Sequence, residues 1–177
     1  VMHRQTGMFS LLRQFTLLLA FISSVWVSPA LPSDAGICER EMAAASARYK
    51  VPLGVLYAVG MTETGRKGSL HPFALNVAGK TVLTSSPVEA LTAFRQSRAK
   101  GIKLIDLGCM QINHYYHGEE FRSVDDMLVP ALNVDYAARF LIQRRVQEGS
   151  CTMAVAGYDA GPDNNPAQGR YVCEVIK

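Results

Sequence analysis

Helix-forming segments separated by Pro and Gly follow one another along residues 38–158, and their succession limits the possible folds more than any other feature of the chain. Residues 38–49 are rich in Ala, Glu, Met and Arg, which favour helix. A second helix is expected over 52–63, because Pro52 suits a first turn and apolar residues follow at helical spacing. Gly65 should end this helix.

A third helix has a start signal made of three residues. Ser86 is a good N-cap, Pro87 suits the first helical position, and Glu89 stands three residues after the cap. This helix should run to Lys100 and stop at Gly101, because glycine readily adopts the left-handed conformation that ends many helices.

The remaining segments complete a mainly helical chain with one small β element. Helices are expected over 133–148, 153–158 and 171–176. The first of these has an apolar face made of Val134, Ala137, Ala138, Leu141 and Ile142. Residues 73–83 carry β-branched side chains around Ala-Gly-Lys and predict a short hairpin. No repeat or linker divides the chain, so the sequence predicts one domain of mainly α (α+β) class.

The first 35 residues differ from the rest and have the pattern of a secretory signal peptide. An apolar run of 13 residues, 15–27, follows two Arg residues and is too short to cross a bilayer as a helix, which takes about 20 residues. Small residues follow, so cleavage is expected after Ala30 or Ala35. The alternatives are a membrane anchor or a buried helix. We therefore divide the chain into a signal peptide, 1–35, and a domain, 36–177.

The charge balance argues against one class of function. The 177 residues include 18 Lys and Arg against 15 Asp and Glu, a net charge of +3, and the basic residues form no run. A nucleic-acid-binding domain typically gathers its basic residues on one face. We therefore expect no nucleic-acid partner.

The part expected to be exported contains four cysteines, namely Cys38, Cys109, Cys151 and Cys173. An even number outside the cytoplasm predicts up to two disulfides, with three possible pairings. Zinc sites usually place two ligands close together in sequence, whereas these cysteines stand 71, 42 and 22 residues apart, so no metal is expected. The alternative is a nucleophilic Cys109 paired with His114 or His117, which is disfavoured because an exported free thiol tends to be oxidised.

One carboxylate stands in the last turn of an otherwise apolar helix, at Glu63. The C-terminal end of a helix is the negative end of its dipole, which disfavours an ionised carboxylate. Apolar neighbours add a desolvation cost in the same direction. Both effects favour a protonated Glu63 near neutral pH, which a general acid requires. The alternative is an exposed Glu near a helix end.

Two further segments place polar side chains within the apolar pattern. Residues 105–117 interleave apolar residues with Gln111, Asn113, Tyr115 and Tyr116. Amides hydrogen-bond to hydroxyl groups, and tyrosines offer an apolar face with a polar tip, so this segment suits sugar rings. Residues 154–161 place Tyr158 at a helix end, before a loop that contains glycine. Taken singly, each segment is also explained by core packing or a turn.

Together and in this order, these segments resemble a bacterial lytic transglycosylase. The resemblance rests on Glu63-Thr-Gly, Gly108-Cys-Met-Gln-Ile-Asn113, residues 133–141, Gly157-Tyr-Asp-Ala-Gly161 and the final Tyr171-Val. The resemblance covers about residues 38–176. The matching part of the family is the soluble-lytic-transglycosylase (SLT) catalytic domain, which is related to goose-type lysozyme. The small members that accompany secretion or conjugation machines are the most similar. Thr64 stands where the family more often has Ser, and Asp159 replaces the usual Asn.

The resemblance implies a lysozyme-like fold with a cleft that binds the glycan strand of peptidoglycan. The catalytic glutamate of the family corresponds to Glu63. The substrate-binding residues of the family correspond to Thr64, Met110, Gln111, Asn113 and Tyr158. No metal or other cofactor is implied, and the sequence has no Gly-rich phosphate-binding loop.

In the mechanism that the resemblance implies, Glu63 protonates the oxygen that joins N-acetylmuramic acid to N-acetylglucosamine. The 6-hydroxyl of the same muramic acid attacks its own anomeric carbon, so that a 1,6-anhydro end forms and no water has to be positioned. A hydrolase would need a second carboxylate, for which Asp106, Asp159 and Asp163 are candidates. A lysozyme-like muramidase and a non-catalytic peptidoglycan-binding scaffold are therefore the alternatives.

The signal peptide and the implied substrate together predict a periplasmic or secreted protein, with no membrane span after signal removal. Peptidoglycan glycan strands are the expected partner, and a secretion or conjugation machine is a second one. The expected role is local cell-wall remodelling around such an assembly.

Overall fold

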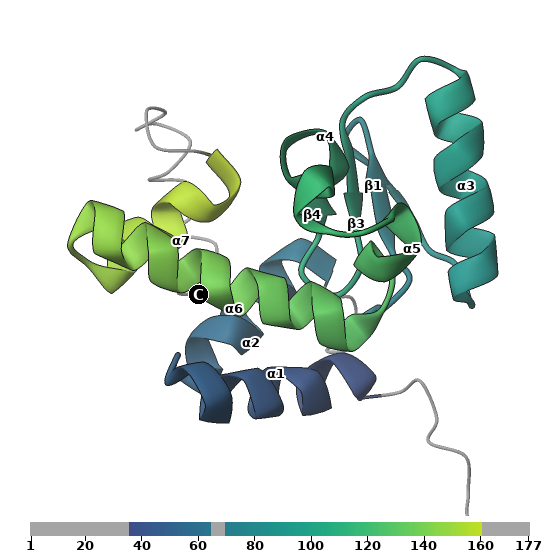
Figure 1. The fold of residues 1–177 in the computed structure, drawn as a ribbon. Coiled ribbons are helices and arrows are strands. Elements are labelled where there is room, and N and C mark those ends of the chain that lie inside the picture. Colours follow the sequence, from purple (N-terminus) through teal and green to yellow (C-terminus); the bar gives the residue numbers. More distant parts are fainter. Residues whose placement is uncertain (1–35, 65–69, 161–177) are drawn as a thin grey trace, which may run out of the picture. The chain divides into compact units, whose positions relative to one another are not determined.

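The computed structural model describes residues 36–64 and 70–160 (Figure 1). The helices in this part of the chain are α1 (Ile37–Tyr49), α2 (Leu53–Thr64), α3 (Pro87–Ala99), α4 (His114–His117), the 3₁₀ turn η1 (Gly118–Glu120), α5 (Val124–Met127), α6 (Pro130–Glu148) and α7 (Cys151–Ala160). The strands are β1 (Leu75–Val77), β2 (Lys80–Val82), β3 (Ile105–Leu107) and β4 (Ile112–Asn113). The prediction of a mainly helical class with a small β element is confirmed.

Three predictions concern segments outside the described residues. They are the signal peptide at 1–35, the helix stop at Gly65 and the helix at 171–176. Within the described residues, no helix has both the length and the apolar character that crossing a membrane requires.

The start of α3 follows the predicted signal closely. The Ser86 hydroxyl accepts a hydrogen bond from the Glu89 backbone N–H at 3.2 Å, and Pro87 occupies the first turn. The Glu89 carboxylate in turn accepts from the backbone N–H and the hydroxyl of Ser85, at 2.9 and 2.8 Å. The cap and the carboxylate together satisfy N–H groups that a helix start leaves without a helical partner. The helix ends at Ala99, one residue before the predicted Lys100.

Helix α6 begins at Pro130, three residues earlier than predicted. The fixed φ of proline suits the first helical position, and Val129 precedes it with extended backbone. Gly149 ends the helix in the left-handed conformation, with φ of 72°. The predicted apolar face is buried except for Ile142, which is half-buried.

The sheet is antiparallel with the strand order β2-β1-β3-β4. The predicted hairpin is confirmed as β1–β2, with φ of 49° at Ala78 and 84° at Gly79 in its turn. Positive φ at both central residues matches the twist of paired strands. The Asn76 side-chain oxygen accepts a hydrogen bond from the Gly79 backbone N–H at 2.8 Å. The sequence did not predict β3 and β4, which extend this hairpin.

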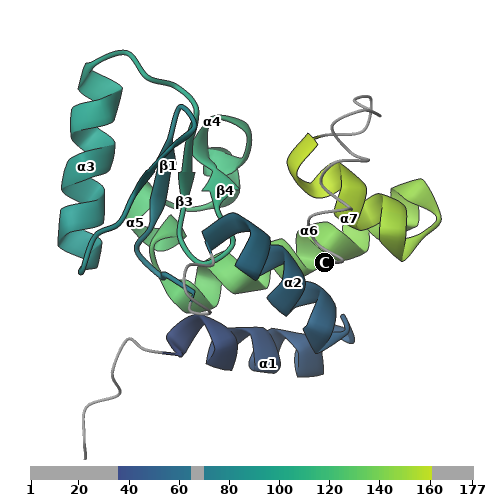
Figure 2. The ribbon, with the colours of Figure 1, turned by 180° about the vertical axis from the view of Figure 1, so that it is seen from behind.

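The helices pack on different sides of the sheet. Helix α6 contacts both α1 and α7, and α1 contacts α2 (Figures 1 and 2). Helix α3 contacts β1 and lies on the side of the sheet away from α1, α2 and α7. The largest side chains with less than 2% of their surface exposed are Met42, Leu56, Leu75, Ile105, Leu107, Met110 and Met127.

One disulfide joins Cys38 in α1 to Cys109 in the turn between β3 and β4. The pairing that the sequence left open is therefore settled for these two cysteines. It also shows that the alternative of a Cys109 nucleophile is wrong, because the sulfur is bonded to Cys38. Cys151 is exposed and makes no disulfide with another described residue, and Cys173 lies outside the described residues, so a second disulfide stays a prediction.

Candidate active site

A cleft of about 260 Å³ lies between the end of α2, the sheet, and helices α4, α6 and α7. The lining residues with polar groups include Glu63, Asp106, Gln111, Asn113, His117 and Tyr158. These residues are up to 95 positions apart in sequence and come from separate elements. The structure thus brings together Glu63, Gln111, Asn113 and Tyr158 from three sequence regions that the resemblance singled out.

Glu63 occupies the last turn of α2 and is half-buried at the edge of the cleft. Its position depends on how closely α2 approaches α1. A Cβ atom on Gly60 would lie 2.4 Å from Cε of Met42 and 3.4 Å from Sδ of Met110, so the bare glycine permits this approach. Gly60 stands three residues before Glu63, one helical turn away. Close packing at the glycine therefore supports the helical turn that carries Glu63. The side chain of Thr64 is outside the described structure.

The turn at residues 108–111 carries Gln111, which is 9% exposed and has an unusual backbone φ of 44°. Its side-chain N–H groups donate to the carbonyl oxygens of Ala74 and Gly108, at 3.0 and 2.9 Å. Both amide hydrogens are therefore used by the protein. Within the described part of the chain the side-chain oxygen has no hydrogen-bond partner, so this residue can offer an acceptor to a ligand in the cleft.

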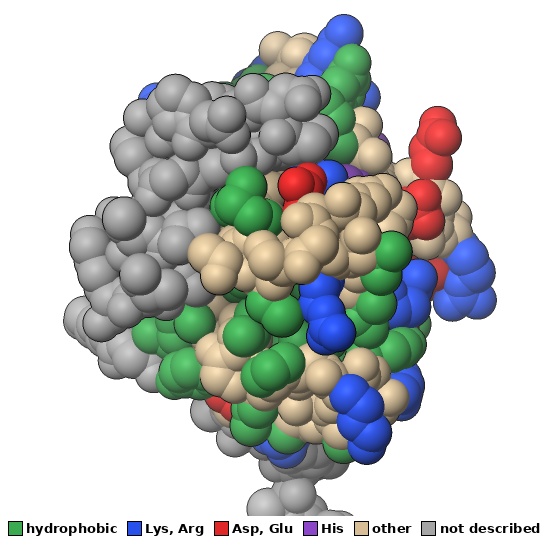
Figure 3. All heavy atoms as spheres, turned by 90° about the vertical axis from the view of Figure 1, so that its left-hand side faces the viewer, with side chains coloured by type: hydrophobic (Ala, Val, Ile, Leu, Met, Phe, Trp, Pro, Cys, Tyr) green, Lys and Arg blue, Asp and Glu red, His purple; other side chains and the backbone are tan. Residues whose placement is uncertain are grey.

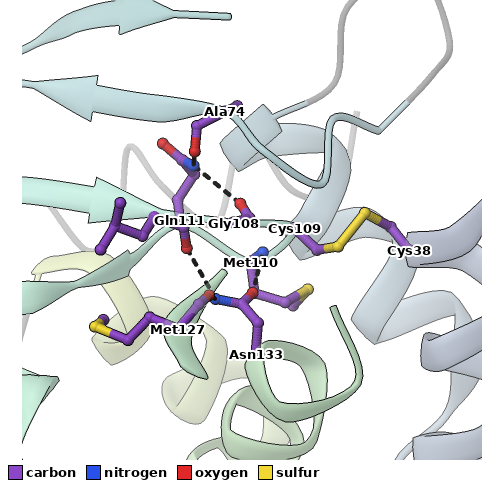
Figure 4. Close-up of a disulfide and its surroundings, with 9 residues drawn as sticks. Cys38, Ala74, Gly108, Cys109, Met110, Gln111, Met127 and Asn133 are labelled. Atoms are coloured by element: carbon purple, nitrogen blue, oxygen red, sulfur yellow. Dashed lines mark hydrogen bonds between the residues drawn. A yellow bond between two sulfur atoms is a disulfide. The ribbon is translucent and has the colours of Figure 1, made fainter. Parts of the chain in front are cut away.

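Asn133 of α6 holds this turn from beneath, as Figure 4 shows. Its fully buried amide donates to the carbonyl oxygens of Leu107 and Met127, both at 2.9 Å. Its oxygen accepts from the Met110 backbone N–H at 2.8 Å. A Cβ atom on Gly108, where φ is 80°, would lie 2.6 Å from Nδ2 of Asn133. From the sequence, Asn133 was placed at the start of a helix and of a segment that resembles the family, but its supporting role was not predicted; an amide beside the apolar face of a helix is the signal for such a role.

Met110 lies in the core and not in the cleft wall. Its side chain has no exposed surface and is absent from the residues that line the cleft in the described structure. Its backbone is the point of attachment for two helices, because the carbonyl oxygen accepts a hydrogen bond from the Tyr158 hydroxyl at 3.0 Å and the N–H donates to Asn133. With the neighbouring disulfide at Cys109, the turn is held by α1, α6 and α7.

Asn113 and Asp106 face each other across β4 and β3, where they are paired in register. The Asn113 amide N–H donates to Oδ1 of Asp106 at 2.5 Å, and its oxygen accepts from the Tyr115 backbone N–H at 3.0 Å. The second contact caps the short helix α4. Among the described residues, two carboxyl groups line the cleft, those of Glu63 and Asp106. Of the other candidates for a second carboxylate, the Asp159 side chain and Asp163 lie outside the described structure.

Aromatic rings from α4, α6 and α7 line part of the cleft. The ring of His117 lies 5.0 Å from that of Phe140 and 5.6 Å from that of Tyr136, and Phe140 lies 5.7 Å from Tyr158. Burial lowers the pKa of His117, partly opposed by the nearby Glu120 carboxylate. Burial raises the pKa of Tyr136 to about 12, with a smaller contribution from Glu120 in the same direction. His117 lines the cleft, a position that the sequence did not predict, since it suggested His117 only as a partner for Cys109.

Within the described residues, no group of three or more His, Cys, Asp or Glu side chains is arranged to hold a metal ion. On the face shown in Figure 3, Lys and Arg side chains are separated by apolar and uncharged atoms, and acidic side chains share the face. The expected absence of cofactors and of a nucleic-acid partner stays a prediction for the whole chain.

Comparison with known proteins identifies the family. The transglycosylase SLT domain matches residues 41–175, which is most of the chain and includes every cleft residue named above. No curated protein and no solved structure matches. The chain therefore belongs to the transglycosylase SLT domain family, the lytic transglycosylases that act on peptidoglycan as non-hydrolytic glycan lyases.

Proposed function

We propose that this chain cleaves the β-1,4 bond between N-acetylmuramic acid and N-acetylglucosamine and leaves 1,6-anhydro-muramic acid ends. The observation that carries the proposal is the place of Glu63 in one cleft with Gln111, Asn113 and Tyr158. An acid, two amides and a phenol in one cleft match the needs of a reaction on a polyhydroxylated sugar chain.

In this proposal Glu63 is the sole acid and base. Its protonated carboxyl group donates to the glycosidic oxygen as the bond from that oxygen to the anomeric carbon of muramic acid breaks. The 6-hydroxyl oxygen of the same sugar forms the new bond to that carbon, and Glu63 takes back the hydroxyl proton. Atoms balance without water, and the intramolecular attack gains its rate from proximity. The half-buried setting of Glu63 limits competing access of solvent.

Among the other predicted site residues, most would act through their side chains and one, Met110, through its backbone. Gln111 and Asn113 would orient sugar hydroxyl and acetamido groups, and Tyr158 would complete the wall beside them. Thr64, next to the acid, would contact the same sugar. Met110 would act through its backbone, because its side chain is buried and its peptide groups bind Asn133 and Tyr158.

The test of Glu63 uses Glu63→Gln and purified sacculi. Glutamine keeps the shape of the side chain but cannot donate the proton, so release of anhydro-muropeptides should fall by about 10²–10⁴-fold. The matched control is Glu119→Gln, because Glu119 is exposed on η1 and does not line the cleft of the described structure. Mass spectrometry of the released fragments measures both. Activity of Glu63→Gln close to that of the control would contradict the assignment, and intact glycan from the wild type would indicate a scaffold.

A hydrolytic muramidase is the second candidate, because Asp106 lines the same cleft as Glu63. A glycosidase that uses water needs a second carboxylate as base or nucleophile. Asp106→Asn removes the charge but keeps an oxygen that can accept the hydrogen bond from Asn113. If the transglycosylase proposal holds, wild type and variant both yield anhydro ends. Reducing ends from the wild type that disappear in the variant would establish the hydrolase instead.

We further propose export through the N-terminal segment and a role in local remodelling around an envelope-spanning assembly. The support is the signal-peptide pattern of residues 1–35 together with a substrate that lies outside the cytoplasm. N-terminal sequencing of the exported protein should locate cleavage after Ala30 or Ala35. Retention of the uncleaved segment in a membrane fraction would indicate an anchor.

A further inference from the structure

His117 is a half-buried residue of the short helix α4, and its side chain lines the cleft. Its ring is packed against Phe140 and Tyr136, with centroids 5.0 and 5.6 Å away, and Tyr116 lies on another side at 6.5 Å. This packing holds the imidazole in one orientation, as a side chain that recognises a ligand requires.

A hydrogen bond with Tyr136 occupies one ring nitrogen of His117, Nδ1, and leaves Nε2 as the nitrogen that a ligand can reach. The Tyr136 oxygen lies 2.8 Å from Nδ1 of His117. The pKa of Tyr136 is raised to about 12 by burial first and by Glu120 second, so the phenol keeps its proton at neutral pH. Burial also lowers the pKa of His117 and favours the neutral imidazole. A neutral imidazole has one N–H, so a tyrosine that donates to Nδ1 places this N–H at Nε2.

The Nε2–H group then needs an acceptor. No protein acceptor for it exists among the described residues, although the ring lines a cleft with room for a ligand. The titratable groups close to the ring include Glu120 on η1, Tyr136 on α6 and Tyr116 on α4, and none of them accepts this N–H in the described structure. An exposed tyrosine, Tyr116, lies next to it in the cleft wall. A sugar offers oxygen acceptors together with an apolar ring face that suits this tyrosine.

We infer that His117 binds the substrate by donating its Nε2–H to a hydroxyl or acetamido oxygen of an N-acetylhexosamine unit, and that Tyr136 is a positioning residue that fixes the tautomer. This inference rests on the proposed function, because it takes the ligand to be a glycan. It assigns His117 to binding and leaves proton transfer to Glu63.

The binding test uses Glu63→Gln protein, so that no turnover occurs, and a soluble tetramer of β-1,4-linked N-acetylglucosamine as the probe. His117→Phe keeps an aromatic ring but removes the donor, and a hydrogen bond worth about 0.5–1.5 kcal/mol predicts a Kd about two- to twelvefold higher. His117→Gln returns an N–H donor at a similar reach and should bind within about twofold of the parent. The matched control is His114→Gln, because His114 shares α4, packs on Phe94 and does not line the cleft in the described structure.

The tautomer is tested by ¹⁵N NMR of the imidazole nitrogens. The parent should show a proton on Nε2 and none on Nδ1 of His117, with the Nε2 resonance shifting when the tetramer binds. Tyr136→Phe should mix the two tautomers and raise the Kd while His117 remains present, which a purely structural role of the histidine would not produce. Thermal unfolding of each variant establishes that it is folded.

The outcomes separate this inference from the proposed function. A folded His117→Phe variant with the parent Kd, or a parent with the proton on Nδ1, overturns the role of His117 even if wild-type protein releases anhydro-muropeptides. A wild type that releases no anhydro ends overturns the proposed function, and the Kd series still reports on His117 in that case.

Discussion

Gly108 and Asn133 show how single residues determine the shape of the cleft. The glycine adopts φ of 80°, and the buried asparagine makes three hydrogen bonds to backbone groups around it. The turn that results carries Gln111 into the cleft wall. The sequence identified the Gly-x-Met-Gln-Ile-Asn segment through resemblance, but it could not reveal that an amide 25 residues later supports it, because this contact depends on the packing of α6 beneath the sheet.

The contact between these residues predicts a difference between two glycine substitutions. Gly101 also has φ of 80°, but a Cβ atom there would meet nothing within 4 Å, so Gly101→Ala should cost about 1–2 kcal/mol of unfolding free energy from backbone strain alone. Gly108→Ala adds a clash with Asn133 and should cost about 1–3 kcal/mol more. Urea unfolding of both variants measures the difference. Equal losses of unfolding free energy in the two variants would show that the contact between Gly108 and Asn133 does not exclude a larger side chain.

At the scale of elements, the sequence predicted the helices and turns whose signals lie within a few neighbouring residues, and it did not predict elements that depend on distant contacts. The cap at Ser86 and the turn at Ala78-Gly79 are complete within a few residues, so α3 and the β1–β2 hairpin were predicted correctly. Strands β3 and β4 have three and two residues, too few for a hydrophobic period to appear. Strand β3 pairs with β1, some 30 residues earlier, and β4 is added to the edge of β3, so the position of both in the sheet depends on a contact that no local pattern contains.

Helix α4 predicts a pH dependence, because both of its histidines have lowered pKa values. Burial is the main cause for His114, with Arg98 adding to it, and burial outweighs Glu120 for His117. In the unfolded chain these histidines take up protons near their ordinary pKa of 6.5, whereas in the folded protein they take up protons only at a lower pH. Between these two pH values the unfolded chain binds more protons, so the free energy of unfolding should decrease as the pH falls from 6.5 through the native pKa. The stabilisation is fully present above pH 6.5.

Urea unfolding of wild type and of the double variant His114→Gln/His117→Gln, at pH 7.5 and at pH 5.5, measures this effect. The variant should lose less stability on acidification. The pKa of Asp135 is itself lowered from 3.8, since hydrogen bonds from Tyr49, Arg139 and Arg48 outweigh the opposing effect of burial, so this carboxylate titrates below the window. The same pH dependence in both proteins would contradict the assignment to α4.

At the scale of the whole described structure, the cleft is a product of long-range connections. Asp135 of α6 accepts hydrogen bonds from Arg48 and Tyr49 at the end of α1, both at 2.7 Å. The Tyr158 hydroxyl links α7 to the turn after β3, and the disulfide links α1 to the same turn. The cleft residues Glu63, Gln111, Asn113 and Tyr158 could be named from the sequence because their motifs resemble those of the family, whereas the residues that support the cleft depend on which elements meet.

The disulfide is the support whose removal has the largest predicted consequence. Cys38 and Cys109 are 71 residues apart, and closing a loop of this length stabilises the fold by about 4 kcal/mol through restriction of the unfolded chain. Cys38→Ala/Cys109→Ala should lower the unfolding free energy by up to that amount, and Cys151→Ala tests separately whether the second disulfide forms, since it should lower the unfolding free energy only in that case. Since Cys109 directly precedes Met110 and Gln111, we also expect the double variant to bind the N-acetylglucosamine tetramer more weakly at a temperature where it is still folded. Unchanged stability together with unchanged Kd would show that α6 and α7 alone hold the turn.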